Sequence, residues 1–296
     1  MTPWVWRSFD LSNYDLVITS CSWYITRGFK VGPKTKVIAY CHTPPRWLYG
    51  YETSVGFTKY WPVKVYAAIV GHFMRLYDFR TAQEIDHWIA NSKNVAARIY
   101  KFYRKDSTVI YPPVDVKHIK NYVSSNKCPK EDHFLIVSRL VGAKGLEEAA
   151  KAFRGTNYSL KIIGEAAGFS DVADRLKRLS GGNIKLLGWV SDEELYKLYV
   201  EAKGFIALAR DEDFGMTVVE SQAAGTPVIA FNGGGFKESV VDGVTGILID
   251  DTSENTIGRA IKRFNKIKWD KSKIQKNAER FSKERFGSNI KKYLLV

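Results

Sequence analysis

The sequence predicts an α/β protein with two doubly wound parallel sheets, and three observations support this prediction. Short apolar runs alternate with helical stretches from residue 133 onward, a pattern typical of parallel sheets. A less complete alternation occupies residues 1–127. The length of 296 residues also suits two domains, since single cores rarely grow beyond about 250–300 residues. We expect one domain over 1–127 and another over 128–280, joined through a polar, lysine-bearing linker at 117–131.

Composition excludes several classes of protein. Hydrophobic residues make up 45% and charged residues 26% of the chain, which are globular values. The sequence has no apolar run long enough for a membrane span, and its start lacks the layout of a signal peptide. Cys21, Cys41 and Cys128 form an odd, scattered set, and the histidines show no metal-ligand spacing. We therefore expect a reducing cytoplasm and no metal site.

The net charge of +14 indicates an anionic partner. Phosphorylated substrates, an anionic membrane surface and nucleic acid are the three candidates. The sequence contains no helix-turn-helix signature, RNP motif or zinc finger, so we place nucleic acid last.

The first domain is expected to contain about four strands. The apolar runs that predict strands are 14–20, 36–40, 86–92 and 109–115, with helices between them at 62–86 and 94–103. The apolar positions of the 62–86 helix are too many for one narrow stripe, which favours burial on two sides. A membrane-interface helix is the second interpretation, because several basic and aromatic residues lie on it or beside it. They are Lys59, Lys64, Arg75, Arg80, Tyr60, Trp61 and Tyr77.

The 94–103 helix is strongly basic and has no acidic neighbour before Asp106. Its cations are Lys93, Arg98, Lys101, Arg104 and Lys105. An anionic partner and a solvated helix face explain this pattern equally well.

The second domain contains the stretch that carries the chemistry. A strand at 204–209 leads into a loop with Glu212 and Gly215, and then into a helix with Glu220. Ligands bind at the carboxyl ends of parallel strands, where a helix start offers N–H groups to an anion. A carboxylate suits two neighbouring hydroxyls, because it accepts hydrogen bonds and donates none. This combination favours a nucleotide sugar as ligand, although two solvated acids beside an ordinary helix are the plain alternative.

A second loop carries two cations. Arg139 and Lys144 follow the strand predicted at 134–138, at the same edge of the sheet as the Glu212 loop. Two fixed cations and a helix start can neutralise the charge that grows on a departing diphosphate, in place of a magnesium ion. Solvated loop residues are the alternative for each of them taken alone. The remaining strands of this domain are predicted at 160–165, 184–190, 227–230 and 246–249.

Two glutamates separated by seven residues around Phe214-Gly215 resemble the signature of the retaining glycosyltransferases of family 4, which have the GT-B fold. The resemblance implies that Glu212 holds sugar hydroxyls and Glu220 the ribose. It implies that Arg139 and Lys144 grip the diphosphate. Three further segments carry implied roles: the backbone of Gly215, Met216 and Thr217 binds phosphates, the Gly233–Gly235 loop with Gly234 covers the donor, and the tail at 281–296 crosses back to the first domain.

The turn His42-Thr43-Pro44-Pro45-Arg46-Trp47 is similar to one in mannosyltransferases of lipid-linked glycan and O-antigen assembly. This similarity implies that His42 lies beside the donor sugar and Arg46 on the acceptor side. A histidine capping a turn and a surface arginine are the plain alternative. In the same family about ninety residues precede the 15–20 strand, so we expect an incomplete N-terminal domain in a fragment, or one completed by another polypeptide.

The sequence thus predicts a retaining glycosyltransferase that moves a hexose, with mannose favoured, from a donor such as GDP-mannose to a glycan or lipid-linked acceptor. The expected catalytic set is Glu212, His42, Arg139 and Lys144, with no metal cofactor and no nucleic acid partner. The expected location is the cytoplasm, at the inner face of the membrane. A truncated, non-catalytic protein or subunit that binds a nucleotide sugar is the alternative function.

Overall fold

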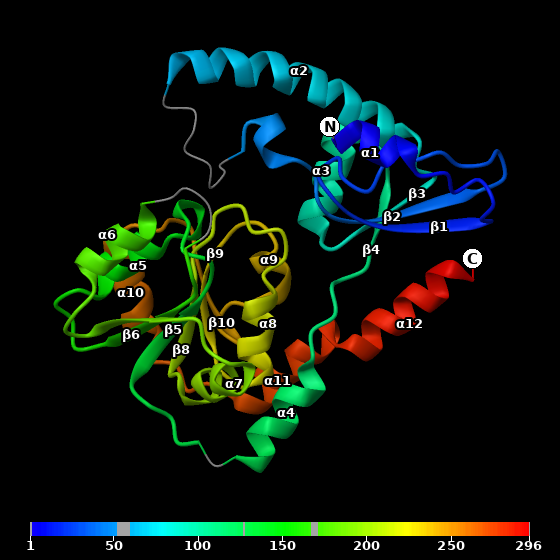
Figure 1. Ribbon diagram of the computed structural model, residues 1–296. Helices are drawn as coiled ribbons and strands as arrows, with labels where there is room; N and C mark the ends of the chain where they lie inside the picture. The colour runs from blue at the N-terminus through cyan, green and yellow to red at the C-terminus, as the bar shows by residue number, and fades with distance from the viewer. Residues whose placement is uncertain (1, 52–59, 127, 167–170, 296) are drawn as a thin grey trace. The chain divides into compact units, whose positions relative to one another are not determined.

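The computed structural model describes residues 2–51, 60–126, 128–166 and 171–295. These residues form two compact units, Met1–Tyr111 (unit 1) and Pro112–Val296 (unit 2). Each unit contains its own parallel sheet (Figure 1). The prediction of an α/β fold with two parallel sheets is confirmed.

Unit 1 has a four-stranded parallel sheet in the order β1-β2-β3-β4. Its strands are β1 (Leu16–Ser22), β2 (Lys36–Thr43), β3 (His87–Ala90) and β4 (Ser107–Val109), and its helices are α1 (Thr2–Ser8), η1 (Arg46–Tyr49), α2 (Trp61–Gln83) and α3 (Lys93–Tyr103). The expected number of strands is thus confirmed for the described part of this unit. The edge strand β1 leaves Leu16 and Ile18 exposed on one face, whereas β2 is buried along most of its length.

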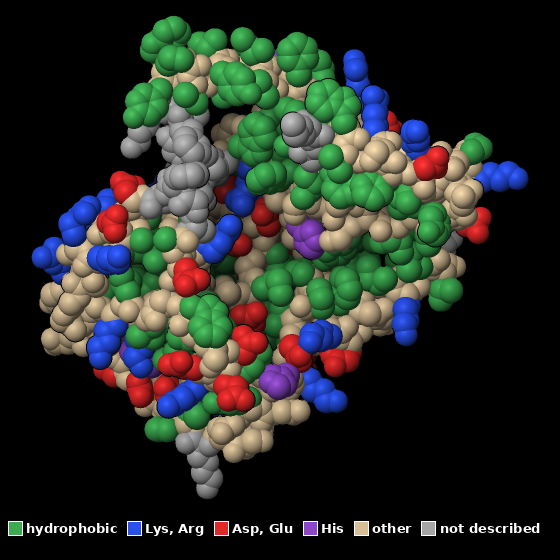
Figure 2. Space-filling view, in the orientation of Figure 1, with side chains coloured by type: hydrophobic (Ala, Val, Ile, Leu, Met, Phe, Trp, Pro, Cys, Tyr) green, Lys and Arg blue, Asp and Glu red, His purple; other side chains and the backbone are tan. Residues whose placement is uncertain are grey.

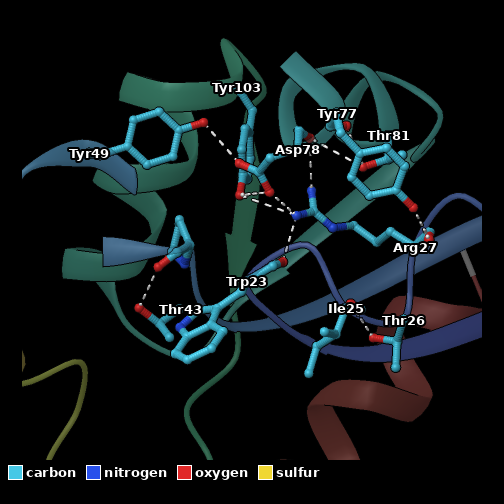
Figure 3. Close-up of polar contacts among 11 residues, drawn as sticks. Trp23, Ile25, Thr26, Arg27, Thr43, Tyr49, Tyr77, Asp78, Thr81 and Tyr103 are labelled. Atoms are coloured by element: carbon cyan, nitrogen blue, oxygen red, sulfur yellow. Dashed lines mark hydrogen bonds and ion pairs between the residues drawn. The ribbon is translucent and has the colours of Figure 1, made fainter. Parts of the chain in front are cut away.

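A buried ion pair fixes the core of unit 1 (Figure 3). Arg27 pairs with Asp78 of α2, and both side chains are fully buried. The Asp78 carboxylate also accepts hydrogen bonds from the hydroxyls of Tyr49 at 2.8 Å and Tyr103 at 3.2 Å. Arg27 donates to the carbonyl of Trp23. Because a buried charge is tolerated only with full pairing, this network ties α2 and α3 to the segment that follows β1.

Helix α2 departs from the prediction of burial on two sides. Its buried positions lie from Gly71 onward, at Gly71, Asp78, Thr81 and Ala82. The preceding part, from Trp61 to Ile69, is exposed all round. The prediction was wrong because apolar residues lie on several sides of α2, whereas unit 1 covers only one of those sides. Among the described helices, none is both long and apolar enough to cross a membrane. Lys59 lies outside the described residues.

Helix α3 begins after Ser92, whose hydroxyl accepts a hydrogen bond from the Val95 N–H at 3.0 Å and caps the helix. Its cations do not form a single solvated face. Arg98 is buried, and its guanidinium lies 4.9 Å from the centre of the Tyr51 ring. Lys101 lies over the same ring at 5.4 Å. Stacking on an aromatic ring therefore accounts for part of the basic pattern.

Unit 2 has a six-stranded parallel sheet in the order β10-β9-β8-β5-β6-β7. Its strands are β5 (His133–Val137), β6 (Ser159–Ile163), β7 (Ile184–Gly188), β8 (Gly204–Ala207), β9 (Val228–Phe231) and β10 (Gly246–Ile249), each within two residues of its predicted range. Its longer helices are α4 (Val116–Ser125), α5 (Leu146–Phe153), α6 (Val172–Leu179), α7 (Asp192–Glu201), α8 (Met216–Ala223), α10 (Glu254–Phe264), α11 (Lys271–Ala278) and α12 (Lys283–Leu294). Numbered from β5, the order is 3-2-1-4-5-6, the doubly wound arrangement whose direction reverses between β5 and β8.

The core of unit 2 lies on both faces of β5 and β8. Every residue of β8 is buried, as expected for a central strand of a sheet covered by helices. Phe134 of β5 packs against the rings of Phe153 and Phe264, from helices α5 and α10. A Cβ atom on Gly204 would lie 2.6 Å from the Phe264 ring, so glycine allows this close approach. This packing and the parallel pairing of Phe134 with Gly204 and of Leu135 with Phe205 hold β5 and β8 side by side.

The expected linker at 117–131 is mostly the helix α4 (Val116–Ser125). The Asp115 carboxylate accepts a hydrogen bond from the His118 N–H at 3.1 Å, and Ile119 is buried. The polar composition of this stretch did not indicate the helix, which depends on a capping residue and a buried apolar residue. The compact units divide after Tyr111, earlier than the expected boundary at residue 127. The tail forms α12 within unit 2, and its expected return to the first domain stays a prediction.

Candidate functional site

Two of the predicted site residues, Lys144 and Glu212, form an ion pair. The Lys144 Nζ lies 2.5 Å from the Glu212 Oε2, and both side chains are about one-fifth exposed. Lys144 ends the short 3-10 helix after β5, and Glu212 lies in the loop after β8. The pair therefore bridges the two strands between which the strand order reverses, where ligands bind in open α/β sheets.

A glycine loop packs directly against the Glu212 loop. The Gly235 N–H donates to the Glu212 carbonyl at 2.9 Å. A Cβ atom on Gly234 would lie 2.3 Å from the same carbonyl oxygen, and one on Gly235 would lie 2.4 Å from the Phe214 Cα. Any other residue would push the two loops apart. Gly234 also has a φ of 54°, in the left-handed region that favours glycine.

The N-terminus of α8 is the second part of the site. Gly215 precedes the helix with a φ of 87°, and a Cβ atom there would lie 2.5 Å from the Phe236 ring. The next two residues, Met216 and Thr217, begin the helix, where backbone N–H groups have no partner within the helix. Such groups and the helix dipole favour an anion. Phe214 is buried and stacks edge-on against Phe281 at 5.2 Å, which anchors the loop.

Glu220 lies farther along α8 in a mostly buried setting. The Tyr199 hydroxyl of α7 donates to the Glu220 Oε2 at 2.8 Å. Burial raises the pKa of Glu220, the hydrogen bond from Tyr199 opposes that rise, and the charge of Asp192 adds to it. One oxygen of the carboxylate thus has a fixed partner, which orients the group. A carboxylate oriented in this way can accept hydrogen bonds from a diol through its second oxygen.

Arg139 lies on the same β5–α5 segment as Lys144, and its side chain is exposed. Its backbone is held: the Arg139 carbonyl accepts from the Val141 N–H at 2.9 Å. A Cβ atom on Gly164 would lie 2.0 Å from the Ser138 carbonyl oxygen, so the end of β6 presses against this segment. These contacts fix the backbone of Arg139. Binding of a diphosphate by its side chain stays a prediction.

His42 and Arg46 belong to unit 1. The His42 Nε2 lies 2.8 Å from the Ser20 hydroxyl, and the His42 carbonyl accepts from the Asn91 side chain at 3.0 Å. Burial lowers the pKa of His42, so its ring is neutral at neutral pH. A neutral imidazole can exchange hydrogen bonds with a hydroxyl. Arg46 begins the 3-10 helix η1 and is half-buried. Their roles toward donor and acceptor stay predictions.

Sequence reasoning missed the groups that orient the predicted residues. Tyr199 lies on the buried side of α7, and its spacing from Glu220 carries no recognisable motif. Ser20 lies within β1 and Asn91 directly follows β3, and the two converge on His42 only through sheet pairing. One signal was available for the core of unit 1: Asp78 is the only acidic residue in the apolar helix α2. An isolated acid in such a helix indicates a buried partner.

Two family models match consecutive parts of the chain. The model described as glycosyl transferases group 1 matches residues 119–281, more than half of the chain. The model described as glycosyltransferase family 4 matches residues 1–118. The first match contains Arg139, Lys144, Glu212 and Glu220, and the second contains His42.

Individual relatives agree with the family models. An uncharacterized glycosyltransferase of Methanocaldococcus jannaschii is 26% identical over 67% of this chain and 55% of its own length. The alpha-1,3/1,6-mannosyltransferase ALG2 of Dictyostelium discoideum is 24% identical over 88% of this chain and 68% of its own. The structure of Anabaena HepE in complex with UDP-glucose matches 95% of this chain and 78% of HepE, with a TM-score of 0.66 and 18% identity. The chain spans about half the length of the first curated relatives it matches.

Proposed function

Because the chain belongs to the glycosyl transferases of group 1 and has the two parallel-sheet units of the GT-B fold, we propose that it transfers a hexose from a nucleoside-diphosphate sugar. The acceptor is a glycan or a lipid-linked saccharide. Mannose is the favoured sugar, since ALG2 is named a mannosyltransferase, although HepE was solved with UDP-glucose. The proposal places the reaction in the cytoplasm, beside a membrane that carries the acceptor.

The ion pair of Lys144 and Glu212 is the observation that carries this proposal. It sets a cation for phosphate and a carboxylate for hydroxyls 2.5 Å apart, beside the N-terminus of α8. A nucleotide sugar presents both kinds of group within one molecule. Lys144, Arg139 and the helix N-terminus would share the diphosphate charge, with no metal ion required. Glu212 would hold the sugar hydroxyls, and Glu220 the ribose.

The proposed chemistry breaks the bond between the sugar C1 and the diphosphate oxygen. The bonding electrons leave with the nucleoside diphosphate, whose growing charge the cations of the site neutralise. The acceptor hydroxyl then bonds to C1 on the face that the diphosphate leaves, and its proton passes to the departing phosphate oxygen. The sugar keeps its anomeric configuration through an oxocarbenium-like state. A trapped sugar–enzyme adduct would contradict this route.

Calorimetric titration of the full chain with GDP-mannose and UDP-glucose tests donor binding. We expect one of the two to bind, and Lys144→Ala to weaken it by about 10–100-fold through the loss of a charged hydrogen bond. Lys203→Ala is the matched control: Lys203 pairs with Asp132 at 2.6 Å at the opposite end of β5 and β8. Equal binding by both variants would refute the assignment of the site.

Transfer is measured separately with radiolabelled donor and lipid-linked saccharide acceptors. Labelled product that depends on Glu212 supports a glycosyltransferase. Binding of donor without any transfer would instead identify a nucleotide-sugar-binding protein or subunit, the alternative predicted from the sequence.

A further inference from the structure

Helix α2 of unit 1 carries a continuous apolar stripe on the side that unit 1 does not cover. The stripe consists of Trp61, Val65, Ile69, Phe73 and Leu76, which are 41% to 75% exposed. Their spacing of four, four, four and three residues places them on one side of the helix. Figure 2 shows large hydrophobic side chains along this helix.

The opposite side of α2 accounts for its attachment to unit 1. Asp78 pairs with Arg27, and Ala82 belongs to the core around β2 and β3. Gly71 is also buried on this side. Because the buried side already fixes the helix, the exposed stripe is not required for folding. A run of apolar side chains of this extent marks an interaction surface.

The charges around the stripe identify the kind of partner. Lys64 lies one turn from Trp61, and Arg80 lies one turn beyond Leu76. Both cations are exposed, whereas Asp78, the one acidic residue of α2, is buried. Basic residues that flank an exposed apolar stripe are typical of helices that lie in the interface of an anionic bilayer.

A second copy of the chain fits the stripe less well. In a two-fold dimer the same surface meets itself, so Lys64 and Arg80 would face like charges with no acid of α2 between them. An anionic lipid surface complements both cations at once. Tyr60 and Trp61 at the start of the helix are also the aromatic types enriched at membrane–water interfaces.

We propose that the exposed stripe of α2 binds an anionic lipid bilayer, with the helix lying in the plane of the interface. From Trp61 to Leu76 the stripe is about 23 Å long, at 1.5 Å per residue. The helix inserts its apolar side chains among the lipids and leaves Lys64 and Arg80 at the headgroups. This inference rests on the proposed function in one respect, namely that a lipid-linked acceptor would lie in the same surface.

Vesicle co-sedimentation of the full chain without nucleotide sugar tests the proposal. We expect binding to vesicles of phosphatidylcholine mixed with phosphatidylglycerol and much weaker binding to phosphatidylcholine alone. Lys64→Gln and Arg80→Gln should each weaken binding to the anionic vesicles by about fivefold, the effect of one charge near the surface. Ile69→Glu with Phe73→Glu should abolish binding, whereas Phe73→Leu should keep it within about twofold of the unchanged protein.

Val244→Glu is the matched control, because Val244 is a 41% exposed apolar residue of unit 2 and should leave vesicle binding unchanged. Circular dichroism and melting confirm that the variants fold. Undiminished binding by the double glutamate variant overturns the proposal. So does a dimer in solution that this variant dissociates, since that result makes a second copy the occupant. Failure of the donor titration with vesicle binding intact would count against the proposed function alone.

Discussion

Replacing Gly235 by alanine should separate the two loops that line the proposed donor site. The backbone of Gly235 has a φ of −71°, which alanine adopts freely, so the substitution adds no backbone strain. The added Cβ atom would lie 2.4 Å from the Phe214 Cα and 2.6 Å from the Asp213 carbonyl oxygen. Both atoms belong to the backbone and cannot rotate away. One loop must therefore shift, and the 2.9 Å hydrogen bond from the Gly235 N–H to Glu212 weakens.

The expected cost follows from this overlap. Overpacking by a methyl group destabilises a close-packed region by about 1–3 kcal/mol. For a unit of the size of unit 2, each kcal/mol lowers the melting temperature by about 2–4 °C. We therefore expect Gly235→Ala to lower the melting temperature of unit 2 by about 2–12 °C, and to weaken donor binding as the Glu212 loop moves.

Scanning calorimetry of the full chain measures this effect, with Gly258→Ala as the matched control. Gly258 lies inside α10, and a Cβ atom there would meet no atom within 4 Å. Alanine should stabilise that helix by about 0.5–1 kcal/mol, because it loses less conformational freedom on folding. If Gly235→Ala melts at or above the temperature of the unchanged protein, the contact between the two loops is not as tight as inferred.

Three further predictions concern single side chains. Tyr199→Phe should raise the already elevated pKa of Glu220, because it removes a hydrogen bond to the carboxylate. Only the carboxylate accepts both hydrogen bonds of a diol, so as the pH is lowered the variant should lose donor affinity at a higher pH than the unchanged protein, as measured by titration across pH. Arg27→Met should destabilise unit 1 by about 3–5 kcal/mol in urea unfolding, since it leaves Asp78 buried and unpaired, while replacing both residues by apolar ones should cost less. Arg139→Ala should change the melting temperature by under about 1 °C, because the side chain is exposed, yet weaken donor binding by about 10–100-fold in calorimetry.

The positions of the strands could be predicted because buried parallel strands are short apolar runs between helical segments. Because the carboxyl ends of parallel strands lie at one edge of a sheet, Lys144 and Glu212, in the loops after β5 and β8, could be expected near that same edge. Their direct pairing could not be predicted, since it depends on side-chain directions that spacing does not encode. The same limit applies to Tyr199, which reaches Glu220 from a different helix.

The exposed stripe of α2 shows where pattern reasoning fails. Apolar residues on several sides of a helix form the same sequence pattern whether protein or lipid covers the outer side. The prediction of a core helix rather than a membrane-interface helix assumed that other parts of the protein cover the outer side of α2. Only the location of the buried side, fixed by Asp78 and Ala82, shows that unit 1 leaves the stripe exposed. In the sequence, Lys64 and Arg80 were the signal for the membrane-interface interpretation, because they flank the exposed stripe.

The Glu212 loop is fixed from several directions within unit 2, and this bears on how the proposed donor would bind. Lys144 holds the Glu212 side chain, Gly235 holds its carbonyl, and Phe214 stacks on Phe281. The Phe281 carbonyl in turn accepts a hydrogen bond from the Val114 N–H at 2.9 Å, at the start of unit 2. Binding therefore has little backbone to order, which lowers its entropic cost. The remaining cost is to open the Lys144–Glu212 pair, and a nucleotide sugar can offset that cost because its phosphate replaces the carboxylate and its hydroxyls replace the ammonium group. A ligand with only one of these groups would leave a partly buried charge without its partner, so the pair itself favours ligands that carry both.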